Sequence, residues 1–142
     1  MGMTVMPPDI ERFLTGYLRS VLGIECDNKE PSGWDGRTEL CVVRDDGGQK
    51  TGLTTFDRSV GVTLYAGTRQ DTERSMQLAR RAFAALTSPS IPAEKGSPIA
   101  AVVDEGCNGP YRVDDEHDTS ACYLTVEYSV CGEVLDIGTD QG

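Results

Sequence analysis

The sequence predicts a mixed α/β fold of the α+β class: a largely antiparallel sheet of about four strands, with two helices packed on one of its faces. Three observations lead to this class. Residues 59–66 alternate between apolar and polar side chains and run directly into a helical pattern that ends near Leu86. A second helical pattern covers residues 10–22, and residues 122–131 form the clearest alternating strand. The predicted order is α-β-β-α-β-β, in a single domain over residues 1–142.

The first helix is predicted to begin at the Pro-Pro-Asp sequence of residues 7–9, because prolines fit the first turn and an acid suits its positive end. Apolar side chains recur at helical spacing up to Leu22, and Gly23 follows, where a left-handed residue commonly ends a helix. The chain ends, residues 1–6 and 136–142, are expected to be flexible.

Residues 24–37 are predicted to form a long loop, because proline, glycine and asparagine lie there among charged residues. This loop contains Trp34, the only tryptophan. Two interpretations remain open. The indole folds back onto its own domain, or it anchors a neighbouring subunit, since tryptophan is enriched at the centres of interfaces.

Residues 38–44 are predicted to form a strand, and Asp46 with Gly47 is a strong signal for a hairpin turn after it. The returning chain reaches the strand at residues 59–66, whose alternate side chains share a face. The face predicted to point into the core consists of Val60, Val62, Leu64 and Ala66.

The second helix follows this strand. Thr68 and Asp71 fit a capping box at its start, and a proline at position 89 stops it because proline lacks an amide donor. Arg80 and Arg81 are expected to complement the negative end of the helix dipole.

The remaining chain is predicted to be irregular over residues 87–98, where prolines, serines and a glycine gather. A strand resumes at 99–103, is interrupted by a bend over 104–110, and is extended by 111–113. The acidic turn at 114–118 then leads into the last strand.

The charge balance is strongly acidic, with 13 basic and 23 acidic side chains and a formal net charge of -10. Such a chain is poorly suited to neutralise phosphates, so direct nucleic-acid binding is not expected. It does suit a surface past which DNA slides without adhering, because like charges repel.

The cysteines form an odd set of five, and no two lie closer than nine positions. With no secretory leader, we expect synthesis in a reducing, intracellular compartment. No apolar run approaches the roughly 20 residues that a membrane-spanning helix needs, so no membrane is expected as a partner.

The sequence contains no clear motif for catalysis or metal binding. His117, the only histidine, lies in the acidic turn, where we expect it to be solvated. A partnership with Cys107 or Cys122 has no local signature, and the spacing of the cysteines around it does not fit a zinc site. The acidic run lacks the alternation and glycine of a calcium loop. We therefore expect no catalytic residue, cofactor or metal, unless His117 proves to be buried beside a cysteine or a carboxylate pair.

Four short segments, in their order and spacing, resemble the tail terminator proteins of long-tailed, siphovirus-type phages, particularly those of actinobacterial hosts. The segments are Ser-Val-Gly-Val-Thr-Leu-Tyr-Ala-Gly-Thr at 59–68, Leu-Ala-Arg at 78–80, Gly-Pro-Tyr at 109–111 and Tyr-Leu-Thr-Val-Glu at 123–127. The resemblance spans residues 7–135 and includes the length of the chain and the order of its elements.

This resemblance implies a small structural virion protein, made in the host cytoplasm, that forms a ring of six on the head-proximal end of the tail tube. Such a ring ends tube polymerisation and presents the surface for head-tail joining. The implied partners are further copies of the chain, the tail tube protein and the head-tail connector protein, with genomic DNA passing through the lumen without specific binding. The family has no catalytic residue to carry over.

A ring needs a contact between two different faces of neighbouring subunits. The candidate contact residues are Trp34 in the first long loop and Asp114, Asp115 and Glu116 in the acidic turn. Three alternatives remain: another neck or head-tail connector component, a small cytosolic ligand- or peptide-binding domain with grooves beside Trp34 and Tyr111, and an enzyme that uses His117.

Overall fold

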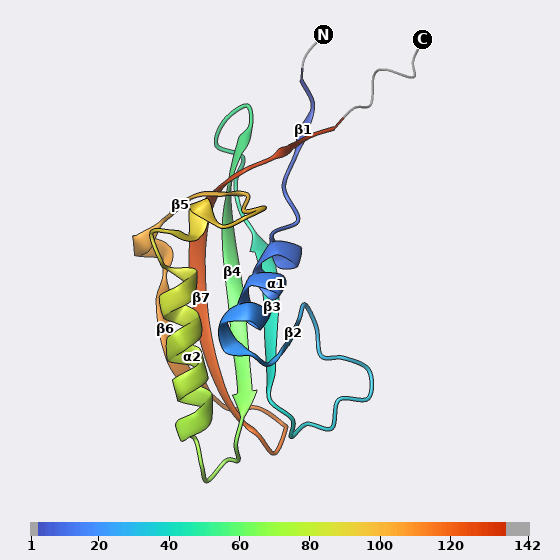
Figure 1. Cartoon of the computed structure of the whole chain (residues 1–142), viewed down its shortest axis with the longest axis vertical. Helices are drawn as coiled ribbons and strands as arrows, with labels where there is room; N and C mark the ends of the chain where they lie inside the picture. The colour runs from blue at the N-terminus through green and yellow to red at the C-terminus, as the bar shows by residue number, and fades with distance from the viewer. Residues whose placement is uncertain (1–2, 136–142) are drawn as a thin grey trace.

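The computed structural model describes residues 3–135 and shows one twisted sheet with helices on one side (Figure 1). The helices are α1 (Ile10–Leu22) and α2 (Glu73–Leu86), with short 3-10 helices η1 (Ile91–Ala93) and η2 (Asp104–Gly106). The main sheet contains β2 (Glu25–Asp27), β3 (Leu40–Gly47), β4 (Thr55–Ala66), β5 (Ile99–Val102), β6 (Asn108–Val113) and β7 (Ser120–Cys131). A separate ribbon pairs β1 (Val5–Met6) with β8 (Glu133–Val134).

The predicted α+β class with two helices and a sheet is confirmed, but the number and order of strands are wrong. The main sheet has six strands instead of about four, in the order β2-β3-β4-β7-β5, with β6 also paired to β7. β2 pairs in parallel with β3 inside a segment predicted as loop. A strand of three residues is too short to show an alternation of apolar and polar side chains, and its stability depends on packing against its neighbours. The sequence therefore did not reveal it.

The strand predicted to start at residue 99 is divided in two. β5 pairs with the end of β7, from Tyr128 to Val130, whereas β6 pairs with its first half. The 3-10 helix η2 lies between them, where the sequence predicted only a bend.

The long antiparallel pair of β4 and β7 forms the centre of the sheet, in unbroken register from Thr55 opposite Cys131 to Ala66 opposite Ser120. Alternate side chains of both strands point toward the helices, as predicted. The buried core on this face includes Val60, Val62, Leu64, Leu124, Val126 and Tyr128. In Figure 1, α1 lies over β3 and β4, and α2 lies beside it over β7.

The predicted limits of α1 are confirmed by its caps. The side chain of Asp9 accepts a hydrogen bond from the Arg12 amide at 3.1 Å. At the other end, Gly23 adopts a left-handed φ of 69° and its amide donates to the Arg19 carbonyl at 2.9 Å. The helix therefore ends where only glycine is free of strain.

The predicted start of α2 is wrong. Thr68 and Asp71 form a separate turn, in which the Asp71 amide donates to the Thr68 hydroxyl at 3.0 Å, and the helix begins only at Glu73. A capping box and a tight turn use the same side chain to amide bond, so the sequence could not separate them. Arg81 does not act on its own helix: its guanidinium donates to the Val21 carbonyl, 2.9 Å away, at the end of α1.

The predicted hairpin turn at Asp46 and Gly47 is a bulge. Gly47 has a φ of 91°, the register shifts there, and pairing continues to the bridge between Lys50 and Phe56. The chain reverses only after this bridge. Both a primed turn and a bulge need a residue with positive φ, which explains the misplacement.

The first described residues, predicted as a flexible tail, include β1. Val5 lies opposite Val134 and Met6 opposite Glu133, and the Leu135 amide donates to the Thr4 carbonyl at 2.7 Å. Figure 1 shows this ribbon leaving the sheet at one end, beside the tip of the β3–β4 hairpin. The prediction for residues 136–142 lies outside the described residues.

Candidate interaction site: an anchored acidic loop

Two loops cover one end of the sheet face that has no helices. They are residues 28–39, before β3, and residues 114–119, before β7. Beneath them is a small second cluster of Leu40, Tyr65 and Ala121, with Trp34, Val42 and Val113 packed against it. Tyr65 is on this face because it alternates with the core residues of β4.

Trp34 packs onto its own domain. Its ring lies 4.9 Å from that of Tyr65 and 4.8 Å from that of His117, measured between centroids. Its indole Nε1–H donates to the Thr38 carbonyl at 3.0 Å. The side chain is half-buried, and its use as a subunit contact stays a prediction.

His117 was predicted to be solvated, and this is wrong: its side chain is only 19% exposed. Its Nδ1 hydrogen-bonds the Asp115 carboxylate, and its Nε2 lies 3.5 Å from an oxygen of Glu30. The imidazole is thus held between two carboxylates and two aromatic rings. These partners come from distant parts of the chain, so a local pattern could not reveal them.

The charges of this cluster reinforce one another. Burial lowers the pKa of His117, but the hydrogen bond and charge of Asp115, with the charge of Glu30, outweigh this and raise it above its ordinary value. Burial raises the pKa of Asp115, but hydrogen bonds from His117 and Tyr65 outweigh this and lower it. A protonated imidazole between two carboxylates is therefore the favoured state.

Tyr65 completes the cluster from below. Its hydroxyl lies 3.2 Å from the Asp115 carboxylate and 3.4 Å from that of Glu30. Burial raises the pKa of Tyr65, and the charges of Asp115 and Glu30 raise it further, so the phenol stays protonated and donates.

The acidic loop alternates between half-buried and exposed side chains, so that its carboxylates divide into two groups. Asp115 and His117 point inward, whereas three acids are exposed and form what we call the acidic ridge: Asp114, Glu116 and Asp118. Arg69, from the turn before α2, holds the backbone by donating to the carbonyls of Asp115 and, at 2.9 Å, His117. Of the predicted contact residues, Asp114 and Glu116 are therefore exposed, and Asp115 is an internal anchor.

The cluster meets the condition set for a catalytic histidine, because His117 lies beside a carboxylate pair. The geometry nevertheless favours a positioning role. A general base needs a ring nitrogen facing the hydroxyl or thiol that it deprotonates, and here both nitrogens face carboxylates. The two cysteines considered as partners bond elsewhere: Cys122 to Ser75, at 3.6 Å, and Cys107 to the Val103 carbonyl, at 3.4 Å.

Three members of the site were not predicted: Glu30, Tyr65 and Arg69. The sequence offered one usable signal, the position of Tyr65 on the strand face opposite the core residues of β4. The contacts of Glu30 and Arg69 depend on how separate loops lie against each other in the fold. The spacing of residues along the sequence does not predict this.

Comparisons with known proteins do not add to this geometry. No protein-family model matches the chain, and no curated protein is detectably similar to it. Within residues 3–135, no group of three or more His, Cys, Asp or Glu side chains is arranged to hold a metal ion. None of the helices described here is long and apolar enough to cross a membrane.

Proposed function

We propose that this chain is a phage tail terminator, a structural virion protein that forms a ring of six on the head-proximal end of the tail tube. In this role it ends tube polymerisation, presents a surface for the head-tail connector, and lets genomic DNA pass through its lumen. The resemblance of four segments to that family suggests the role, and one structural observation supports it best: the acidic ridge is fixed in place.

The support from the ridge is electrostatic. Asp114, Glu116 and Asp118 are exposed on a loop that His117 and Arg69 anchor. Fixed carboxylates facing a DNA passage repel phosphates without needing any specific contact. Over a Debye length of about 8 Å at physiological salt, this repulsion would keep the genome from adhering as it moves. The net charge of -10 acts in the same direction.

The two ends of the molecule also differ in a way that suits a component between unlike partners. The acidic ridge lies at one end of the long axis, and the β1–β8 ribbon leaves from the other (Figure 1). A terminator contacts the tube on one side and the connector on the other, so chemically distinct ends support the proposal.

The decisive experiment inactivates the gene in its phage and measures tail length and head attachment by electron microscopy of the lysate. Filled heads beside detached, overlong tails, restored to normal by the intact gene supplied in trans, would support termination. Detached tails of normal length would point to another neck or connector component instead. Fully assembled virions would remove both structural roles.

A ligand- or peptide-binding domain is the second candidate, and a groove along α1 favours it. This groove has a volume of about 1000 Å³ and is lined by neither Trp34 nor Tyr111, beside which grooves were predicted. Normal virions from the inactivated phage, together with a peptide bound at this groove by the purified monomer, would support that function over a terminator.

A further inference from the structure

Among residues 3–135, the large apolar side chains that are exposed gather at one end of the molecule, except for Tyr111 on β6. Leu53, at the tip of the β3–β4 hairpin, is 64% exposed, and Val134, on β8, is 65% exposed. The hairpin and the ribbon are joined by a hydrogen bond from the Gly132 amide to the Thr54 carbonyl, 2.8 Å long. We call residues 3–6 and 133–135 the apolar arm; its exposed apolar residues are Met3, Met6, Val134 and Leu135.

The arm is an incomplete structure by itself. Its two strands have two residues each, and an isolated two-stranded ribbon is at best marginally stable in water. Contiguous exposed apolar side chains on a projecting segment typically mark an interaction site. A partner that covers these side chains would complete the ribbon.

Charge favours a second copy of the chain as that partner. With a net charge of -10, two copies repel each other over most of their surfaces. The described part of the arm has a single charged side chain, Glu133, so the arm can approach another copy at little electrostatic cost.

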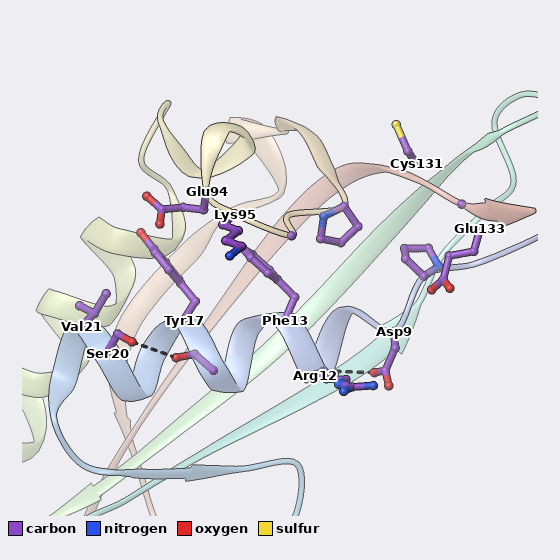
Figure 2. A pocket seen from close by; sticks show the side chains of 15 residues that line it. Asp9, Arg12, Phe13, Tyr17, Ser20, Val21, Glu94, Lys95, Cys131 and Glu133 are labelled. Atoms are coloured by element: carbon purple, nitrogen blue, oxygen red, sulfur yellow. Dashed lines mark hydrogen bonds between the residues drawn. The ribbon is translucent and has the colours of Figure 1, made fainter.

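The groove along α1 offers a complementary surface. Phe13 and Tyr17 project from α1 toward the segment containing Glu94 and Lys95 (Figure 2). Their rings are stacked, with centroids 5.9 Å apart and planes 9° from parallel. The Tyr17 hydroxyl donates to the Ala85 carbonyl at 3.0 Å, which fixes this aromatic wall before any partner arrives.

The rim of the groove includes two cations, Arg12 and Lys95, that can face the arm's Glu133 in another copy. Three acids line the groove as well: Asp9, which caps α1, Glu94 and Glu133. In the same molecule the arm extends away from the groove, and of the arm's residues only Glu133 lines the wall, next to Gly132. The arm therefore suits the groove of a neighbour better than its own.

We propose that the apolar arm of each copy docks into the α1 groove of the next copy. The two surfaces are different patches of one chain, so the contact is heterologous and repeats from copy to copy until it closes into a ring. This inference rests on the proposed ring-forming function and names the surfaces that would build it.

Site-directed cross-linking tests the contact. Cys131 is replaced by Ser to remove the exposed thiol in the groove, and one cysteine is then added to the arm, Val134→Cys, or to the exposed end of the groove, Ser20→Cys. Full-length proteins are mixed at high concentration and oxidised with copper phenanthroline. Equal parts of the two single variants should give a covalent dimer, each variant alone should not, and the double variant should give a ladder of oligomers.

Two results would overturn the proposal. A dimer from Val134→Cys alone would show that arms pair with each other, and the absence of a dimer in the mixture would show that the arm does not reach the groove. A charge in the arm gives an independent measure: Val134→Glu should weaken self-association at least about tenfold in sedimentation experiments. Ala84→Glu adds the same charge on an exposed position of α2 and should leave self-association unchanged.

The same variants separate this inference from the function on which it rests. If phage with Val134→Glu make normal, head-joined tails while the inactivated gene gives overlong ones, the docking proposal fails and the terminator function stands. If the inactivated gene leaves tails normal, the function fails whatever the cross-linking shows.

Discussion

His117 packs its imidazole against the indole of Trp34, with ring centroids 4.8 Å apart, and this contact joins two loops that lie far from each other in the sequence. The same imidazole binds Asp115 from its own loop and approaches Glu30 from the loop of Trp34. The acidic ridge is therefore presented by a loop with internal anchors. His117 and Arg69 are the anchors, and only His117 can change its charge near neutral pH.

Stability should depend on pH through this histidine. The pKa of His117 is raised in the folded protein, so its protonation stabilises the fold. The contribution is fully present below the unfolded pKa of about 6.5 and is lost as pH rises through the higher folded pKa. Urea unfolding at a series of pH values, followed by the fluorescence of Trp34, should show the free energy of unfolding decreasing as pH rises above about 6.5.

The matched control is His117→Gln, which keeps a hydrogen-bonding side chain but cannot be charged. This variant should lose the decrease that the wild type shows above pH about 6.5, and an equal pH dependence in both proteins would contradict the assignment. Asp115 should affect the free energy of unfolding at low pH. Its pKa is lowered, so its contribution is present above the unfolded pKa of about 3.9 and is lost as pH falls through the folded value.

The sequence predicted those elements whose pattern is long enough to be read locally. α1 was predicted because its apolar residues recur at helical spacing up to Gly23, and β7 because residues 122–131 alternate between two faces. β2 was missed because it has three residues and is stabilised by pairing with β3. The hairpin turn was misplaced because Gly47 has the positive φ that both a turn and a bulge require.

The candidate site was only half predictable for a related reason. Acidic residues in a turn are visible in the sequence, so Asp114, Asp115 and Glu116 were predicted as contacts, and of these Asp114 and Glu116 are exposed. That Asp115 and His117 point inward depends on the aromatic rings of Trp34 and Tyr65, which the fold brings to the same place. Alternate side chains of a loop point inward and outward only where the loop lies against the rest of the protein, and the sequence does not show that it does.

A methyl group at Gly61 should destabilise the protein. Gly61 lies on the open face of β4, where an added Cβ would overlap the Tyr123 phenol and come within 3.2 Å of the Asp46 carboxylate. Those side chains are held by Arg44, which binds Asp46 at 2.7 Å and the Tyr123 hydroxyl at 3.3 Å. We expect Gly61→Ala to lower the free energy of unfolding by about 1–3 kcal/mol in urea titrations.

Alanine at Gly16 should instead raise the free energy of unfolding, and this substitution is the control. Gly16 lies inside α1, and nothing stands within 4 Å of an added Cβ. Gly16→Ala should therefore stabilise the protein by about 0.5–1 kcal/mol, because alanine is the better helix former. In a Tyr123→Phe background, which removes the overlapping hydroxyl, the cost of Gly61→Ala should decrease. An unchanged cost would show that the overlap is not its cause.

Neutralising the acidic ridge should impair genome passage without changing tail length, if the proposed function holds. The variant Asp114→Asn/Glu116→Gln removes two exposed charges and leaves the anchors Asp115 and His117 intact. Its free energy of unfolding should change by no more than about 0.5 kcal/mol, as for most surface substitutions. Phage with this variant should assemble normal tails but eject DNA more slowly, measured by dye entry into the released genome.

Asp104→Asn/Glu105→Gln is the matched variant, because it removes two exposed acids outside the ridge. It should eject DNA at the normal rate. Equal slowing by both pairs would attribute the effect to net charge, and no slowing by either would remove the ridge from the DNA passage.

The five cysteines should react with iodoacetamide in an order set by their burial. Cys131 is exposed and should be alkylated first, as followed by mass spectrometry of the native protein over time. Cys107 is half-buried, and burial raises the pKa of its thiol, so it should follow more slowly. Cys26, Cys41 and Cys122 are buried and should react only when the protein opens; in urea all five should react together.

Cys26 is the informative member of the buried group. It lies opposite Cys41 in the parallel pairing of β2 with β3, and the interaction between the two neighbouring thiols lowers the pKa of Cys26 and raises that of Cys41. Because β2 is a three-residue edge strand, local opening should expose it before the core of the sheet. Among the buried thiols, Cys26 should therefore be modified first. Modification of Cys122 before Cys26 would show that β7, at the centre of the sheet, opens more readily than β2.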